Sequence, residues 1–404
     1  MVTDTLNRPA GVEPTPGAAI GLPVAVSAVI PCLNEEQTIA LCIEKAFRGF
    51  LELGVQGEVV VADNGSTDRS VEIARSMGAR VIDERRKGYG AALLRGITEA
   101  RGEIIVMADA DDSYDWTAIA PFVRKIREGY DLVMGNRFQG GIMAGAMPHL
   151  HRYLGNPVLS LIARIAFRTK IGDFHCGMRA FTRAAFDRMQ LKTTGMEFAT
   201  EMVANASHQK LRIAEIPIVL YPDKRNRAPH LRSFRDGWRH LRFILTYAPD
   251  YLYLAPGAAL LFPGLILEIL LSRGPVTLHG AYLGIHFLAL GSLLTLVGFN
   301  VINLGVLAKT LMAQRYTGIN SRTVRLVRHG FSLEAGLLAG VALTLTGIGI
   351  DAVIAAKWIA TFGAPMDATV HLAFVATTAL VLGLNLICSS FLLHLIQAEG
   401  SART

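Results

Sequence analysis

The sequence predicts a two-part protein: an α/β domain with a mostly parallel sheet, followed by an all-α transmembrane domain of four helices. Short β-branched runs alternate with helical stretches between positions 24 and 135, as in βαβ units. Four apolar stretches follow position 250. Only 18% of the 404 residues are charged, against about a quarter in soluble domains, and most charges lie before position 250. This composition rules out a disordered chain and argues against a purely soluble enzyme.

The α/β domain is expected over residues 23–223. The leader, 1–22, is predicted to be disordered, because it is rich in proline and glycine and lacks the pattern of an export signal. Strands are expected at Val24–Ile30, Glu58–Ala62, Arg80–Asp83, Glu103–Met107 and Asp131–Met134, with helices near 36–49, 68–77, 90–101 and 117–128. The apolar strands indicate a sheet covered on both faces. Residues 150–222 look helical and close with a strand at Arg212–Leu220.

A basic segment over residues 224–250 is expected to follow that domain. It opens with Lys224–Arg227 and continues as a helix over Ser233–Tyr247. Within this helix, apolar anchors such as Trp238 recur at helical spacing and are flanked by arginines. Such a helix can lie flat in the headgroup layer of a membrane, and the alternative is an ordinary surface helix packed on the domain.

The transmembrane domain is expected over residues 251–404, with spans at about 252–271, 280–308, 333–356 and 369–396. Basic residues concentrate in the loop between the second and third spans, which places that loop and the α/β domain on the cytoplasmic side of the plasma (inner) membrane. Polar residues inside the spans, among them Glu268 and Asp351, are interpreted as snorkelling or interhelical hydrogen-bonding groups, and a transport role is the alternative.

The charge and the cysteine content indicate the binding partners and the compartment of the protein. The net charge of +7 lies mostly beside the apolar half, so that anionic lipid is the expected partner and nucleic acid is not. The four cysteines form no CxxC pair, which indicates reduced thiols in a cytoplasmic compartment. The sequence leaves a monomer and a homo-oligomer both open.

Polar residues stand at three predicted strand ends, where parallel sheets bind their ligands. They are Asn34–Glu36 after the first strand, Asp63–Ser66 after the second and Asp109–Asp112 after the fourth. Two carboxylates around a small residue suit a hard divalent ion that neutralises a diphosphate. For Asp112 and Ser113 the alternative is capping of the next helix, and for Asp115 capping is the expected role.

The chemistry of two further loops is less specific. Asp63 is suited to accept hydrogen bonds from a nucleobase or a ribose. Lys87 lies in the glycine-containing loop Lys87–Gly90, from which it can reach a phosphate. A plain surface turn is the equal alternative for that loop.

The order of these motifs resembles the inverting family 2 glycosyltransferases of the GT-A fold. The motifs are Pro31–Glu36, Asp63–Asp68, Lys87–Gly90 and Asp109–Asp111. Further along, three segments resemble the polyprenyl-phosphate branch, namely Gly135–Phe138, Asp173–Arg179 and the basic Lys224–Arg232. Members of that branch are dolichol-phosphate mannose synthases and undecaprenyl-phosphate glucosyltransferases. The resemblance covers residues 24–250 by motif, and the four spans match in general architecture.

The resemblance implies the following roles. The nucleotide-sugar site would be formed by Pro31, Asn34, Glu35, Asp63, Lys87, Asp109 and Ala110. Asp109 and Asp111 would hold Mg²⁺ or Mn²⁺ at the diphosphate. The lipid phosphate would meet Arg137, Cys176, Arg179, Arg225 and Arg227, with Asp111 and Arg137 as the catalytic pair. For Arg137 the alternative is a structural ion pair with Asp131 or Asp173.

The implied activity is transfer of a hexose from a GDP- or UDP-hexose to polyprenyl phosphate at the cytoplasmic membrane face. Mannose synthases read Asp-Ala-Asp-Leu-Gln-His-Pro where this chain has Asp109–Asp115, so that Ser113 or water replaces a glutamine ligand and mannose and glucose both stay open. One alternative is a processive polysaccharide synthase, although the Arg-Trp dipeptide of such enzymes does not occur in this sequence. Another is a translocator of lipid-linked sugar whose α/β domain only binds nucleotide.

Overall fold

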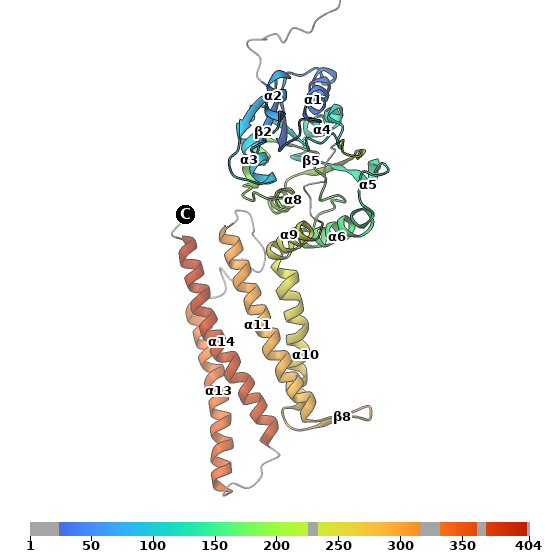
Figure 1. The fold of residues 1–404 in the computed structure, drawn as a ribbon. Helices are drawn as coiled ribbons and strands as arrows, with labels where there is room; N and C mark the ends of the chain where they lie inside the picture. The colour runs from blue at the N-terminus through green and yellow to red at the C-terminus, as the bar shows by residue number, and fades with distance from the viewer. Residues whose placement is uncertain (1–23, 225–232, 316–331, 362–368, 402–404) are drawn as a thin grey trace, which may run out of the picture. The chain divides into compact units, whose positions relative to one another are not determined.

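The computed structural model of the protein describes residues 24–224, 233–315, 332–361 and 369–401 (Figure 1). The backbone falls into two compact units. The first consists of Met1–Pro157, Ile171–Ala199 and Leu211–Arg232, and the second of Val158–Lys170, Thr200–Lys210 and Ser233–Thr404.

A seven-stranded sheet, with strand order β3-β2-β1-β4-β6-β5-β7, organises the first unit. Its strands are β1 Val26–Cys32, β2 Gly57–Asp63, β3 Arg80–Asp83, β4 Ile104–Met107, β5 Leu132–Asn136, β6 Arg179–Thr182 and β7 Ile213–Pro217. All neighbouring strands pair in parallel except at β6, which is antiparallel to both β4 and β5. The predicted mostly parallel α/β sheet is therefore confirmed.

The strand β6 corrects the prediction that residues 150–222 are helical before a single closing strand. This strand has only four residues and begins with an arginine, so it lacks the continuous apolar run from which a strand is predicted. In the sheet, Arg179 pairs with Met107 of β4 on one side and Met134 of β5 on the other. As a result, the carboxyl ends of β4 and β5 lie at the same edge of the sheet with the start of β6 between them.

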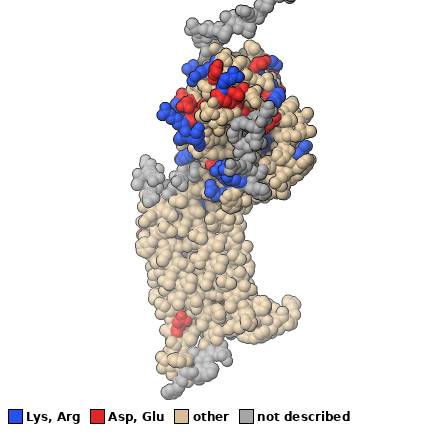
Figure 2. Space-filling model, viewed as in Figure 1, with Lys and Arg blue, Asp and Glu red and all other residues tan. Residues whose placement is uncertain are grey.

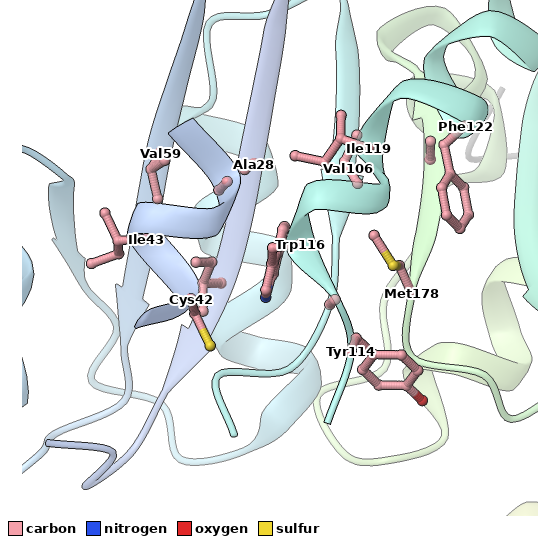
Figure 3. Close-up of a cluster of buried hydrophobic side chains, with 14 of the residues drawn as sticks. Ala28, Cys42, Ile43, Val59, Val106, Tyr114, Trp116, Ile119, Phe122 and Met178 are labelled. Atoms are coloured by element: carbon pink, nitrogen blue, oxygen red, sulfur yellow. The ribbon is translucent and has the colours of Figure 1, made fainter. Parts of the chain in front are cut away.

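The helices of the first unit cover the sheet because their apolar faces match its apolar strands. They are α1 Ile39–Leu53, α2 Ser70–Ser76, α3 Tyr89–Glu99, α4 Ile119–Arg127, α5 Arg137–Gly140 and α7 Arg183–Met189. One core cluster joins α1 to the sheet and to the segment after β4, and Figure 3 shows Trp116 there among Cys42, Ala28 and Ile119. Trp116 is completely buried. This core lies under the loop that carries the acidic motif.

The second unit is dominated by long apolar helices, α10 Ala255–Leu271, α11 Ile285–Arg315, α13 Leu333–Ala360 and α14 Val370–Ser401. Four stretches are long and apolar enough to cross a membrane, at Asp250–Leu271, Ile285–Ala313, Leu333–Ala360 and Val370–Ala398. They confirm the predicted transmembrane architecture. The second span begins later than predicted, because Val276–Leu278 and Ala281–Leu283 form a small antiparallel hairpin, β8–β9, that the sequence did not reveal.

The charges are distributed as the sequence predicted. Figure 2 shows lysine, arginine, aspartate and glutamate crowded on the visible face of the first unit and nearly absent from that of the helical unit.

The two shorter helices α6 Asn156–Phe167 and α8 Phe198–His208 contribute residues to both units. The amphipathic helix α9, Ser233–Tyr247, belongs to the second unit and buries Phe243, Ile244 and Tyr247 while Trp238 stays exposed.

Candidate functional site

The acidic motif Asp109–Asp111 forms the turn that follows β4, and the core beneath holds its backbone in place. The indole Nε1 of Trp116 donates to the carbonyl of Asp109 at 3.2 Å, and the Cys42 thiol donates to the carbonyl of Ala110 at 3.4 Å. Ala110 is buried, so a larger side chain would displace the turn. Close packing around Ala110 therefore explains why a small residue lies between the two aspartates.

Each aspartate of the turn is oriented by a neighbouring hydroxyl. The Tyr89 hydroxyl donates to Oδ1 of Asp109 at 2.9 Å, and the Ser113 amide and hydroxyl donate to Oδ1 of Asp111 at 3.0 and 2.5 Å. Burial and the Asp109 charge raise the pKa of Tyr89 well above its ordinary value, so its proton stays on the hydroxyl. Both carboxylates thus have a fixed orientation at the carboxyl end of a strand.

These two carboxylates fit a divalent ion that also takes ligands from a substrate. Mg²⁺ in proteins is commonly held by one or two carboxylates together with substrate phosphates and water. Among the described residues, no three His, Cys, Asp or Glu side chains gather into a site that could hold a metal by itself. Asp109 and Asp111 therefore suit a metal that arrives with a diphosphate better than a permanently bound structural ion.

The next residue, Asp112, has a role that the sequence did not reveal. Its backbone is left-handed, with φ of 58°, and its carboxylate bridges Lys45 at 2.6 Å and Lys224 at 2.7 Å. The Asp112 carboxylate raises the pKa of Lys224, so this lysine is cationic. The helix cap is made instead by Asp115, which accepts from the Thr117 amide at 3.1 Å, as expected from the sequence.

Asp112 thereby joins the acidic turn to the start of the basic segment. The chain after β7 returns to the turn, where the Tyr221 amide donates to the Ser113 carbonyl at 3.0 Å and the Lys224 amide to the Asp111 carbonyl at 3.3 Å. The expected lipid-phosphate ligands Arg225 and Arg227 lie outside the described residues, directly after this anchor. The first residue of the basic segment, Lys224, is therefore in direct contact with the acidic turn, although more than a hundred residues separate the two in sequence.

The predicted nucleotide residues gather where β1 and β2 end side by side. Cys32 of β1 is in register with Asp63 of β2, which places Pro31 beside Ala62. Both oxygens of Asp63 accept from its own turn: Oδ2 from Gly65 N at 3.0 Å, and Oδ1 and Oδ2 both from Ser66 N at 3.2 Å. Asn34, left-handed with φ of 57°, accepts from the Thr67 amide at 2.7 Å, and the backbone amide of the buried Glu35 donates to the Ser70 hydroxyl at 2.7 Å.

The loop with Lys87 is fastened to the same strand end by Asn64. The Asn64 amide donates to the carbonyls of Glu84 and Arg86 at 2.9 and 2.8 Å, and its oxygen accepts from Gly88 N at 2.8 Å. The exposed Lys87 ammonium donates to the Asn64 carbonyl at 2.8 Å. Lys87 is thus held at the edge that carries Asp63, and Asn64 is a positioning residue that the sequence analysis treated only as part of the turn.

Arg137 lies after β5, at the same edge, in a buried ion pair. Its Nε and Nη2 donate to Asp173 at 2.7 and 2.8 Å, and its amide donates to the same carboxylate at 3.1 Å. Asp173 is fully buried and Arg137 is 7% exposed. Among the described residues, Nη1 of Arg137 donates to none, so one arm of the guanidinium is not committed to this pair. The structural partner considered from the sequence, Asp173, is therefore present, and a contact through Nη1 is compatible with it.

Cys176 and Arg179 lie behind the surface of the site. Arg179 is 0% exposed, and its guanidinium donates to the carbonyls of Cys176, Ala199 and Phe174. Cys176 is equally buried, and burial raises the pKa of its thiol to about 12. In this structure neither side chain reaches a surface from which it could face a lipid phosphate, which corrects the role implied by the resemblance. The correction arises because residue type does not reveal burial.

An apolar surface along α6 was missing from the sequence analysis. Val158, Leu161 and Ile165 are exposed on this helix, and Tyr153 and Leu154 are exposed just before it. The spacing of three and four residues between Val158, Leu161 and Ile165 places these three along one side of the helix, a pattern that the sequence already contained. This side chain pattern is typical of helices that contact the membrane surface.

Comparisons with known proteins agree with this architecture. The chain matches the model of glycosyl transferase family 2 over residues 27–190 and that of the glycosyltransferase family 2 C-terminal transmembrane region over residues 306–397. It is 40% identical over 370 residues to the low-salt glycan biosynthesis hexosyltransferase Agl6 of Haloferax volcanii, covering 91% of this chain and 88% of that protein. It is 34% identical over 194 residues to the dolichyl-phosphate hexose transferase of that organism, covering 48% of this chain and 81% of that one.

Among solved structures, the chain resembles glucosyl-3-phosphoglycerate synthase from Mycobacterium tuberculosis in complex with Mn²⁺, UDP-glucose and phosphoglyceric acid. The TM-score is 0.43 at 22% identity, and the match covers 56% of this chain and 80% of that one.

Proposed function

Because the chain belongs to glycosyltransferase family 2, we propose that it transfers a hexose, mannose or glucose, from a GDP- or UDP-sugar to polyprenyl phosphate with inversion at the anomeric carbon. The observation that carries this proposal is the pair of oriented carboxylates Asp109 and Asp111, joined through Asp112 to the start of the basic segment. Similarity to a dolichyl-phosphate hexose transferase and the four apolar helices support a lipid acceptor.

The chemistry requires little proton transfer. An oxygen of the lipid phosphate attacks the anomeric carbon while the bond from that carbon to the diphosphate breaks. A phosphate monoester has a second pKa near 6, so the acceptor is mostly dianionic at neutral pH and needs no strong general base. The enzyme must instead bring two anions together and stabilise a diphosphate leaving group.

The residues of the site divide this work. Asp109 and Asp111 would hold Mg²⁺ or Mn²⁺, which supplies positive charge to the leaving diphosphate. Pro31, Asn34, Glu35 and Asp63 line the strand ends assigned to the nucleotide, and Lys87 lies beside them within reach of a phosphate. Arg137, through its Nη1 arm, and the residues after Lys224 are assigned to the lipid phosphate, since guanidinium groups bind phosphate oxygens strongly.

We place the reaction at the cytoplasmic face of the plasma membrane. The loop between the second and third spans carries Arg315, Arg322, Arg325 and Arg328, whereas the connection between the first and second spans holds only Arg273 and that between the third and fourth holds no lysine or arginine. Basic loops are retained on the cytoplasmic side. The exposed apolar side chains of α6 and the exposed Trp238 of α9 support contact of these two helices with the membrane surface.

Reconstitution tests this proposal directly. The full-length protein in nanodiscs containing polyprenyl phosphate is incubated with labelled GDP-mannose, UDP-glucose and related donors, with Asp111→Asn as the inactive control. We expect label in the organic phase as a lipid with a single phosphate, and only with the wild type. Label in an insoluble polymer would indicate a processive synthase instead, and donor binding without any transfer would indicate a translocator.

A further inference from the structure

Glu268 is a buried carboxyl group inside an apolar helix. It belongs to α10, one turn before the helix ends at Leu271, within the first span Asp250–Leu271. The residue is only 4% exposed. A buried, ionised carboxylate within a membrane-spanning helix is unfavourable, so its charge should be compensated.

No basic side chain of the described residues compensates the charge of Glu268. Among the residues that the structure describes, no lysine, arginine or histidine pairs with Glu268, whose Oε1 is buried without a hydrogen-bond partner. The buried basic groups of the same unit have other contacts. Lys309 pairs with Asp250, and His371 at the start of α14 contacts the Leu271 carbonyl through Nδ1 at 2.7 Å.

Oxygen atoms from two other helices surround the carboxyl group instead. Thr295 of α11 and Thr378 of α14, which are 0% and 4% exposed, both approach the Glu268 carboxyl closely enough to interact with it. The Thr378 hydroxyl is also 2.6 Å from that of the buried Ser292 of α11. Thr295 Oγ1, like Glu268 Oε1, has no hydrogen-bond partner within the described part of the chain.

Glycines explain why α10 and α11 come so close. A Cβ atom on Gly264 of α10 would lie 2.8 Å from the Gly291 carbonyl and 2.7 Å from the Thr295 hydroxyl, both on α11. Only glycine permits this backbone contact, which is the usual device for close helix packing in membranes. Glu268 follows Gly264 by one turn on the same side of α10, so the crossing fixes its carboxyl against α11.

We propose that Glu268, Thr295, Thr378 and Ser292 form an intramembrane site for one monovalent cation, H⁺ or Na⁺. Carboxylate and hydroxyl oxygens are hard ligands, which suit a proton or an alkali ion. A single carboxylate balances one positive charge, whereas a divalent ion would leave a net charge in an apolar region. The site lies one turn from the end of its span, which gives the ion a short path to the loop at residues 272–284.

Carbodiimide labelling of the full-length protein in nanodiscs tests this site. Dicyclohexylcarbodiimide modifies protonated carboxyl groups in apolar surroundings, and peptide mass spectrometry locates the adduct. We expect labelling at Glu268 in sodium-free buffer. Protection by Na⁺ but not by choline at equal ionic strength would identify Na⁺ as the ligand, whereas labelling that no salt suppresses would identify H⁺. Asp351 of α13, another carboxyl group within a span, serves as the internal comparison.

Variants separate a binding site from a structural contact. In the Na⁺ case, we expect the wild type to gain about 3–6 °C in melting temperature from saturating Na⁺, and Glu268→Gln to gain nothing. Thr295→Val, which keeps the volume but removes a ligand, should weaken Na⁺ protection about tenfold, the effect of losing roughly 1.4 kcal/mol. Hexose transfer by these variants reports whether they are folded. Absence of labelling at Glu268, together with equal responses of the wild type and Glu268→Gln to Na⁺, would refute the site.

Discussion

The acidic side of the site, after β4, and the arginine side, after β5 and before β6, lie at one edge of the same sheet but are built in opposite ways. Asp109 is half-buried, Asp111 is as buried as Arg137 (8% and 7% exposed), and each aspartate is oriented by a hydroxyl group. Arg137 and Arg179 are buried, and protein acceptors take up most of their donors. Residues at equivalent strand ends can therefore differ in whether they are available to a ligand.

The difference separates activity from stability. Replacing an acid of the turn by asparagine should affect transfer and leave the fold intact, because the amide oxygen can still accept from the Tyr89 hydroxyl or from the Ser113 amide and hydroxyl. Removing a buried arginine should destabilise the fold, because it leaves a buried carboxylate or several carbonyls without a donor. Substitutions on the two sides should consequently give opposite patterns of melting temperature and turnover.

The largest effect is expected for Arg137→Ala. Loss of the guanidinium leaves the Asp173 carboxylate buried and uncompensated, which should cost about 3–5 kcal/mol of unfolding free energy. Thermal unfolding measures this loss, and adding Asp173→Ala should recover much of it. If the double variant is stable but has a raised KM for lipid phosphate, Nη1 contacts the acceptor. If it is stable and its kinetics are normal, Arg137 is purely structural.

Asp111→Asn should lower kcat more than a hundredfold, since a lost metal ligand removes several kcal/mol of leaving-group stabilisation. Its melting temperature should stay within about 2 °C of the wild type, because asparagine keeps the volume of Asp111 and an oxygen that accepts from the Ser113 amide and hydroxyl. Chelation of divalent ions should reduce the wild type to the level of the variant. The matched control is Asp115→Asn, at the nearby cap, which should retain turnover. Normal turnover of Asp111→Asn in chelator would exclude the metal role.

Tyr89→Phe should reduce turnover about tenfold, corresponding to roughly 1.4 kcal/mol, the scale of one hydrogen bond. The hydroxyl acts on the reaction only by orienting Asp109, so Tyr89 is a positioning residue. We expect the apparent affinity for Mn²⁺ to fall with it. Tyr114→Phe is the matched control, because its hydroxyl accepts from the Gly177 amide and its loss should lower the melting temperature instead. Unchanged Mn²⁺ dependence in Tyr89→Phe would contradict this role.

The smallest effect is expected at the opposite edge of the sheet, at Glu58 near the start of β2. Burial raises the pKa of Glu58, but hydrogen bonds from the Arg101 amide, Ser27 and Arg80 outweigh burial and lower it overall. A carboxyl group with a lowered folded pKa stabilises the fold above its unfolded pKa of about 4.3, and the contribution disappears as pH falls through the folded value.

Glu58→Gln should therefore destabilise the protein at neutral pH by less than about 1 kcal/mol, because the pair is partly exposed and screened. The difference from the wild type should vanish in acid. Melting temperatures measured across this pH range check the sign, and a difference that grows as the pH falls would contradict it. Transfer at neutral pH should be unaffected, since this acid–arginine pair lies at the other end of the strands from the site.

The acidic side of the comparison was largely predictable from sequence. The apolar runs of β1, β2 and β4 are continuous, and acidic residues follow each of them, so their meeting at one edge follows from parallel pairing. The four spans were predictable because length and apolar content alone define them.

The arginine side was predictable only in part. Asp173 was one of two candidate partners of Arg137, but the burial of this pair depends on contacts distant in sequence. The strand β6 is four residues long and lies between two strands that precede it by more than forty residues. Its insertion buries Arg179 and brings Asp173 to Arg137. Asp112 was considered as a helix cap because its partners are not close in sequence: Lys45 lies 67 residues before it, and Lys224 lies far after it. Local patterns carry no information about such contacts.

Isothermal titration of a nucleoside diphosphate in the presence of Mn²⁺ tests the difference between the two sides most directly. The wild type, Asp111→Asn and the stable pair Arg137→Ala with Asp173→Ala are compared in nanodiscs. We predict that Asp111→Asn loses the Mn²⁺-dependent part of the affinity and that the arginine–aspartate double variant keeps it. Loss of diphosphate binding in the double variant, with normal binding by Asp111→Asn, would contradict the account and assign the donor to the arginine side.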